Sequence, residues 1–269
     1  MAYSLTYSYN STSESYTVTG YSNITTSDNV VIPDTYDDGT NGEHPVTSIG
    51  ESAFRDCSSL TSITIPDSVT SIGGFAFGVC NNLTSVTIGN SVTSIGMNAF
   101  DMCSSLTSIT IPDSVTNIGN GAFINCSRLT SVTIGNSVTS IGHYTFSGCS
   151  SLTSITIPDS VTSIGNGAFR DCTNLKQLIL FPSTPPTLGT SESPTTISKI
   201  YVQQSSKAAY QADTNWKTFA GKIIANNFYL SLFNFNQENK KHIEKKIDEA
   251  KEYSVQSADN KISMSVTIW

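Results

Sequence analysis

The chain has 269 residues, of which 38% are hydrophobic and only 13% charged, and its formal net charge is −7. Ordinary soluble domains carry roughly 25% charged residues, so this chain is unusually poor in charge. The negative charge disfavours a nucleic-acid partner. Membrane insertion is also disfavoured, because no segment reaches the roughly 20 apolar residues of a membrane-spanning helix.

Residues 1–45 alternate apolar and polar side chains with the period of a β-strand, interrupted by the polar stretch 10–14. We therefore expect a β-rich N-terminal cap with a hairpin, leading into a half repeat at 46–50. The opening sequence MAYSLTYSYN lacks the basic start and apolar core of a secretory signal. Either the chain is not secreted by that route, or a leader has been removed. The alternating apolar residues of the cap are Leu5, Tyr7, Tyr9, Tyr16 and Val18.

Residues 46–180 contain a 23-residue repeat that reads A-F-x-x-C-x-x-L-T-S-[IV]-T-I-[PG]-[DN]-S-V-T-S-I-G-x-x. Proline and glycine alternate at one position, so a 46-residue double repeat overlies the single one. Repeats of this length are typical of solenoids, in which each unit contacts only its neighbours. The six copies are marked by Cys57, Cys80, Cys103, Cys126, Cys149 and Cys172.

The apolar spacing of one repeat predicts one circuit of a leucine-rich-repeat solenoid. L-x-x-I-x-I from Leu60 places two isoleucines on one face of a short strand, and V-T-S-I-G from Val69 forms a second extended segment. Gly73 permits the next bend, and residues 53–57 fit a single helical turn. We expect six coils of mostly parallel β-structure with short helical turns. Caps are needed at both ends, since one coil buries too little apolar surface to fold alone.

Residues 181–226 are predicted to form a mixed C-terminal cap, with a strand at 200–202 and a helical piece from about residue 206 to 224. Residues 227–269 follow as an extra strand–helix–strand tail, which would dock on the cap or on another subunit. The residues expected to cover the last coil are Trp216, Phe219 and Ile223.

Two patterns resemble known kinds of site but do not meet their requirements. One is the cysteine ladder, which resembles a disulfide or zinc site, and the other is an acidic stretch that resembles a calcium loop. Each cysteine occupies the same inward position of successive coils, which predicts a ladder of buried free thiols rather than disulfides or zinc ligands. The acidic stretch 34–39 has Tyr36 where a calcium ligand is needed, so a solvated turn is expected there. We predict no metal and no cofactor.

Enzyme activity has little support in the sequence. His44, His143 and His242 have no partner at a useful spacing, and the sequence has no nucleophile elbow, phosphate loop or zinc-protease motif. We predict no catalytic residues.

The repeat copies differ mainly at two pairs of positions, directly after Ile-Gly and directly before Cys. In-register stacking would place both pairs in ridges along one side of the solenoid, where aromatic, Met and Arg side chains suit a partner-binding surface. Free drift of unconstrained turn positions is the alternative explanation. The candidate partner-binding residues are Arg55, Phe75, Met97, Met102, His143, Tyr144 and Arg170.

The outward Ser-x-Thr pairs, beginning with Ser62 and Thr64, would stack into hydroxyl ladders similar to the faces of ice-binding solenoids. Thr is also ordinary strand chemistry, and mixed Ser makes a poor ice template. Ice binding is therefore a remote alternative.

The repeat resembles the BspA-like leucine-rich repeats, whose unit A-F-x-x-C-x-x-L-x-x-I-x-I-P-x-x-V-x-x-I-G stands here from Ala53 to Gly73. The resemblance implies a non-catalytic, extracellular or cell-surface protein of bacteria or parasitic protists, with relatives that act as adhesins toward host matrix proteins and cells. The leading hypothesis is thus a protein or glycan ligand on the solenoid surface. The alternative is a scaffold that docks a partner or self-associates into oligomers through residues 227–269.

Overall fold

The computed structural model describes residues 3–25, 29–189 and 196–225. The strand–helix–strand tail predicted at 227–269 lies outside the described residues, so that prediction stays untested. Below, coils 1 to 6 are the coils that contain the six cysteines, from Cys57 in coil 1 to Cys172 in coil 6.

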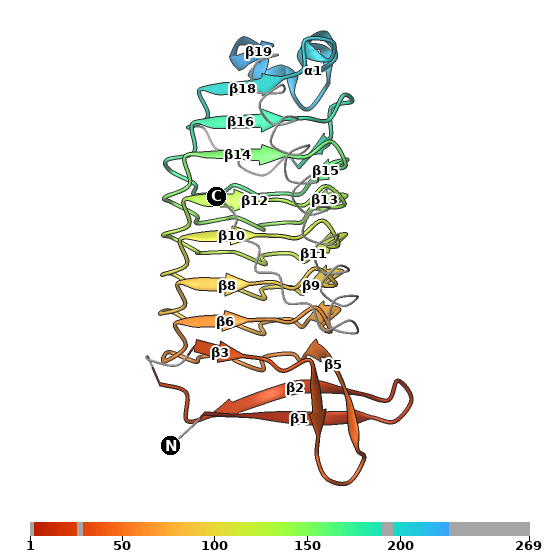
Figure 1. The fold of residues 1–269 in the computed structure, drawn as a ribbon. Coiled ribbons are helices and arrows are strands. Elements are labelled where there is room, and N and C mark those ends of the chain that lie inside the picture. Colours follow the sequence, from red (N-terminus) through yellow and green to blue (C-terminus); the bar gives the residue numbers. More distant parts are fainter. Residues whose placement is uncertain (1–2, 26–28, 190–195, 226–269) are drawn as a thin grey trace, which may run out of the picture. The chain divides into compact units, whose positions relative to one another are not determined.

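The described chain forms a solenoid in which parallel strands stack in two ladders (Figure 1). This arrangement confirms the predicted solenoid of mostly parallel β-structure. The first ladder contains β3 (Asn29–Val31), β6 (Ser62–Thr64), β8 (Ser85–Thr87), β10 (Ser108–Thr110), β12 (Ser131–Thr133), β14 (Ser154–Ile157), β16 (Gln177–Leu180), β18 (Lys199–Val202) and β19 (Ile223–Ala225). The second ladder contains β5 (Glu43–Ile49), β7 (Ser71–Ile72), β9 (Ser94–Ile95), β11 (Asn117–Ile118), β13 (Ser140–Ile141), β15 (Ser163–Ile164) and β17 (Thr187–Leu188).

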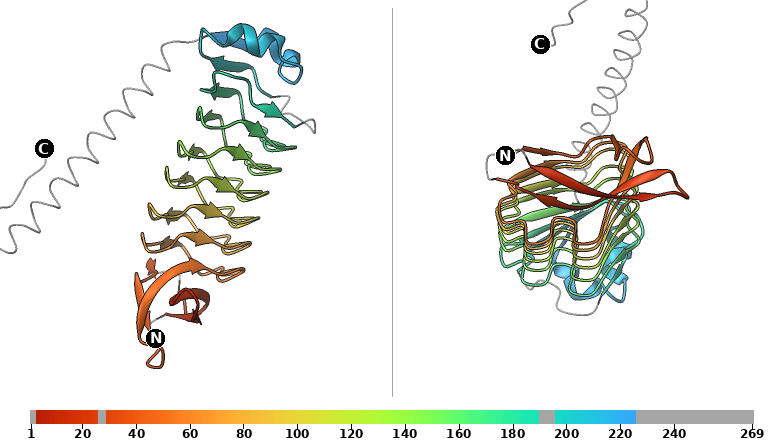
Figure 2. Two further views of the ribbon diagram at one scale, coloured as in Figure 1. Left: turned by 90° about the vertical axis from the view of Figure 1, so that its right-hand side faces the viewer. Right: turned by 90° about the horizontal axis from the view of Figure 1, so that it is seen from below.

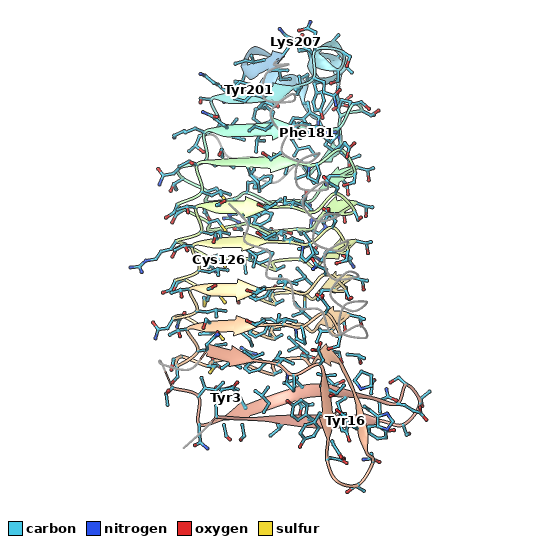
Figure 3. The ribbon with its side chains drawn as sticks, in the orientation of Figure 1. Tyr3, Tyr16, Cys126, Phe181, Tyr201 and Lys207 are labelled. Carbon is cyan, nitrogen blue, oxygen red and sulfur yellow. The ribbon has the colours of Figure 1, made fainter. Side chains whose placement is uncertain are left out.

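The N-terminal cap is the predicted hairpin, made of β1 (Ser4–Asn10) and β2 (Ser15–Ser22). Strand β2 pairs in parallel with β5 and thereby joins the cap to the second ladder. Strand β4 (Thr35–Asp37) pairs with the first residues of β5 in the antiparallel direction. The buried Tyr16 ring, labelled in Figure 3, fills the centre of the cap, and its hydroxyl donates to the Gly42 carbonyl oxygen at 3.3 Å.

The C-terminal cap differs in part from the prediction of one helical piece between residues 206 and 224. Helix α1 (Lys207–Ala212) is followed by the 3-10 helix η1 (Lys217–Lys222), and Ile223 already begins strand β19. The helix is interrupted because Asp213 has extended backbone and its carboxylate accepts the N–H groups of the two residues before η1. The buried Trp216 donates to the Pro186 carbonyl oxygen at 2.7 Å and covers the last coil, as expected.

The backbones of successive coils nearly superpose when the solenoid is seen from below (Figure 2, right). Residues 23 apart therefore occupy the same place in successive coils, and the interior is built from columns of like side chains. The phenylalanine rings of neighbouring coils stack nearly parallel, with centroids 5.0–6.0 Å apart. Tyr21 from the cap extends this stack, 5.7 Å from Phe54. The six cysteines are free and buried, which confirms the predicted thiol ladder, and Cys126 is labelled in Figure 3. From coil 2 onward each thiol donates to the Phe carbonyl oxygen of the preceding coil at 3.0–3.3 Å.

Proline and glycine alternate because coils associate in matched pairs. A Cβ atom on Gly89 of coil 2 would lie 2.3 Å from the Pro66 carbonyl oxygen of coil 1, so that position must be glycine. Beside it, the Asn90 N–H donates to Asp67 Oδ1 at 2.6 Å. Strands β6 and β8 of this coil pair share a sheet, whereas β8 and β10 do not. The same contacts join coils 3 and 4 through Pro112, Asp113, Gly135 and Asn136.

Candidate functional site

The candidate residues lie on the turn side of the solenoid, which we define as residues 50–57 of coil 1 and their equivalents. In coil 1 the N–H groups of Ser52, Phe54 and Asp56 donate to carbonyl oxygens of coil 2, and the intervening N–H groups close tight turns within the coil. The segment is therefore a run of tight turns and not the single helical turn expected at 53–57. The reason is that every second N–H group joins one coil to the next.

Two positions in every coil have left-handed backbone, with φ between 52° and 74°. One is the second residue after Ile-Gly, and the other directly precedes Cys. Left-handed φ costs roughly 1–2 kcal/mol for a residue with a Cβ atom, and Gly, Asn and Asp tolerate it best. Most of these positions carry Gly, Asn, Asp or Ser. The exceptions are Phe75, Val79, Met102 and Tyr144.

Three of the candidate residues, Phe75, Met97 and Met102, lie on the turn side of the neighbouring coils 2 and 3, and Arg55 of coil 1 lies over the first of them. The Arg55 guanidinium lies 5.0 Å from the Phe75 ring centroid, and the Phe75 N–H donates to the Met97 carbonyl oxygen. Met97 and Met102 are 55% and 45% exposed. We call this surface the apolar turn patch, which consists of Arg55, Phe75, Val79, Met97 and Met102.

Val79 is a member of this patch that the sequence analysis did not select. Its N–H donates to the Asp101 carbonyl oxygen, so it lies next to Met102 in coil 3. Its left-handed φ of 62° is especially unfavourable for a β-branched side chain. Its place in the variable pair before Cys80 was the signal that could have identified it.

The patch carries charge at its border. Arg55 Nε lies 3.7 Å from Asp56 Oδ2, and both side chains are largely exposed. Burial raises the pKa of the Asp101 carboxyl group, and nearby Arg55 opposes that shift. The apolar surface is therefore flanked by both signs of charge.

The remaining candidate residues are separated from the patch by coil 4. His143 and Tyr144 are exposed on coil 5, and the Tyr144 ring covers the backbone of Gly167 on coil 6. Arg170 on coil 6 forms an ion pair with Asp171, Nε to Oδ2, at 3.5 Å. The seven candidate residues thus form two groups rather than one continuous ridge.

The hydroxyl ladder needed for ice binding is interrupted. Ser62 and Thr64 align with Ser85 and Thr87 on β8, but the hydrogen-bonded pairing stops before β10. Within the described ranges, no helix is long and apolar enough to cross a membrane. The same ranges contain no cluster of three or more His, Cys, Asp or Glu residues that could hold a metal ion.

The family model for the BspA-type leucine-rich repeat region, which has six copies, matches residues 47–176 and again 122–254. These matches cover more than half of the chain. The chain belongs to the BspA-type leucine-rich repeat family. The second match runs past residue 226 into the predicted tail.

Solved structures agree with this assignment, whereas no curated protein matches the chain. The leucine-rich repeat protein of T. pallidum has 30% identity and a TM-score of 0.60, over 69% of this chain and 83% of that protein. A leucine-rich repeat protein of Bacteroides ovatus has 26% identity and a TM-score of 0.51, over 83% of this chain and 66% of that one. The pneumococcal vaccine antigen PcpA shares the fold, at 23% identity and a TM-score of 0.50, over 76% and 49% of the two chains.

Proposed function

We propose that this protein is a non-catalytic binding module that recognises a partner protein through the apolar turn patch. The observation that best supports the proposal is the presence of Phe75, Val79 and Met102 at left-handed surface positions. Most equivalent positions in the coils carry Gly, Asn or Asp, which fit the backbone at lower cost. A cost that is retained on the surface, away from the core, is typical of a functional requirement.

The composition of the patch favours a protein partner. Aromatic, Met and Arg side chains are enriched at protein interfaces, and Met adapts its shape to the opposing surface. The Arg55 guanidinium over Phe75 holds both side chains in place, which lowers the conformational entropy lost on binding. The repetitive Ser and Thr strands offer no comparable anchor.

We also propose display at the cell surface and a role in adhesion to host proteins or cells. Membership of the BspA-type family supports this part of the proposal. The binding experiment below tests the patch independently of where the protein resides.

The test compares the full chain with the triple variant Phe75→Asn, Met97→Asn and Met102→Asn by surface plasmon resonance over a panel of immobilised extracellular-matrix and cell-surface proteins. Loss of central interface anchors, each contributing about 2 kcal/mol, should weaken binding by at least about 30-fold. The matched control is the strand-ladder variant Thr87→Asn, Thr110→Asn and Thr133→Asn, which should bind as the parent does. No ligand in the micromolar range, or equal loss in both variants, would contradict the proposal.

The scaffold alternative depends on residues 227–269, which lie outside the described residues. Light scattering of the full chain against a 1–226 truncation tests it, and two monomers would exclude self-association through that segment.

A further inference from the structure

A second surface feature lies on coils 4 to 6, away from the apolar turn patch. It is a groove of about 470 Å³ along the second strand ladder, within the size range of ligand sites. The lining contains two runs of a hydroxyl residue followed by Ile, Gly and a polar residue, together with Asn120 and the shorter run of Thr, Leu and Gly at 187–189. The hydroxyl residues are Ser140, Ser163 and Thr187, and the residues that line the other side are Asn120, His143 and Asn166.

Two glycines of the groove cannot be replaced by larger residues, because the backbone of the neighbouring coil lies too close to them. A Cβ atom on Gly165 would lie 2.6 Å from the His143 backbone nitrogen, and one on Gly189 would lie 2.4 Å from the Asn166 backbone nitrogen. The hydroxyl groups of Ser140 and Ser163 take part in none of the side-chain hydrogen bonds of the described chain. They are therefore available to a ligand.

Hydrogen bonds between coils hold the polar side chains in fixed orientations. Asn120 Oδ1 accepts the His143 N–H at 2.9 Å, and His143 Nδ1 accepts the Asn166 N–H at 2.8 Å. An imidazole whose Nδ1 accepts a hydrogen bond carries its proton on Nε2. The Asn120 Nδ2 amino group and the His143 Nε2–H are thus oriented donors that the contacts between coils do not use.

The lining selects an uncharged polar ligand. Among the described residues that line the groove there is no acid, Lys or Arg. Tyr144 follows directly, 38% exposed, and its ring covers Gly167, which provides an aromatic face beside the polar groove. Neutral polyols with apolar ring faces combine these two requirements.

We infer that this groove binds a neutral linear oligosaccharide that lies along the solenoid axis. Parallel strands repeat every ~4.8 Å, which is close to the advance of one sugar unit in an extended glycan. Successive coils can therefore present Ser140, Ser163 and Thr187 to successive sugars, and the Asn120 amino group and the His143 ring can donate beside them. In coils 1 to 3 the residues equivalent to His143 are Glu51, Gly74 and Met97, so the array is confined to coils 4 to 6.

This site goes beyond the proposed protein-binding function and uses different residues. The test is isothermal titration of the full chain with four neutral hexasaccharides: cellohexaose, maltohexaose, xylohexaose and chitohexaose. At least one should bind saturably. Ser163→Leu, which fills the groove, should weaken that binding at least tenfold. Two variants should leave it unchanged: Ser71→Leu, at the equivalent ladder position of coil 1, and Phe75→Asn in the protein-binding patch.

Tyr144→Gly provides a second measurement that does not depend on the folding of Ser163→Leu. Coils 4 and 6 already carry Gly121 and Gly167 at that position, so the variant should fold normally while binding several-fold more weakly. Two results would overturn the inference. One is no heat of binding with any of the four sugars at millimolar concentration, and the other is binding that survives both substitutions.

Discussion

The strand ladders and the turn side of the same coils follow opposite rules. On the strands, Ser and Thr recur almost unchanged from coil to coil, and the backbone is ordinary extended chain. On the turn side, residue identity varies widely although two positions per coil have left-handed φ. The turn side, where most side chains strain the left-handed backbone, thus carries the most diverse residues.

The difference shows how this solenoid separates stability from recognition. The strand side holds coils together through regular hydrogen bonds and, at the matched pairs, through the close approach of glycine to proline. The turn side is anchored from inside by the stacked phenylalanines and the cysteine column. Because that inner anchor is strong, the outer positions tolerate bulky residues at a local cost.

The largest effect is expected from removing the inner anchor of the turn side. Phe100→Ala should lower the free energy of unfolding by about 3–5 kcal/mol, since it opens a cavity in the aromatic stack between Phe77 and Phe123. Urea unfolding measures this change. The half-buried Phe75→Ala should cost much less, and equal costs would show that the stack is not the anchor.

A smaller loss should follow from disturbing a matched coil pair on the strand side. A Cβ atom on Gly135 would lie 2.2 Å from the Pro112 carbonyl oxygen, so Gly135→Ala should destabilise by roughly 1–3 kcal/mol. Gly221→Ala is the control, because no atom lies within 4 Å of its added Cβ. Thermal unfolding of both variants measures the difference. If Gly135→Ala unfolds at the same temperature as the parent, close packing against proline does not explain the double repeat.

The cysteine column should make stability fall in alkali. Burial raises the pKa of Cys80 from 9.0 to about 12, so between these values the folded state keeps a proton that the unfolded state releases. The contribution of this thiol to the free energy of unfolding is therefore fully present below about pH 9. It is lost as pH rises toward 12, by about 1 kcal/mol per pH unit for each such thiol. Denaturation at several pH values should give a shallower slope for Cys80→Ala, and identical slopes would contradict this assignment.

The smallest effect should be a gain in stability on the outer turn side. Val79→Asn relieves a left-handed β-branched residue and should raise the free energy of unfolding by about 1 kcal/mol. Asn125 already occupies the equivalent position of coil 4. Thr110→Asn on the strand side should be neutral or slightly destabilising. A loss of stability in Val79→Asn would mean that its packing outweighs the backbone strain.

The sequence by itself determined the solenoid, its coil boundaries and its inward columns. A 23-residue period places Phe, Cys and Leu at the same point of every circuit, and exclusion of these side chains from water leaves one way to stack them. The hairpin cap and the covering role of Trp216 followed from strand alternation and from the need to close an open coil end. These features depend on patterns that can be read along a single chain.

Only the tertiary structure decided which positions are left-handed, why proline alternates with glycine, and where the surface divides into an apolar patch and a polar groove. Each of these depends on contacts between residues that face each other across two coils. The Gly89 backbone against the Pro66 carbonyl and the His143 ring against the Asn166 N–H are examples. The repeat sequence alone does not reveal such contacts, because the distances between the contacting atoms depend on how closely neighbouring coils approach each other.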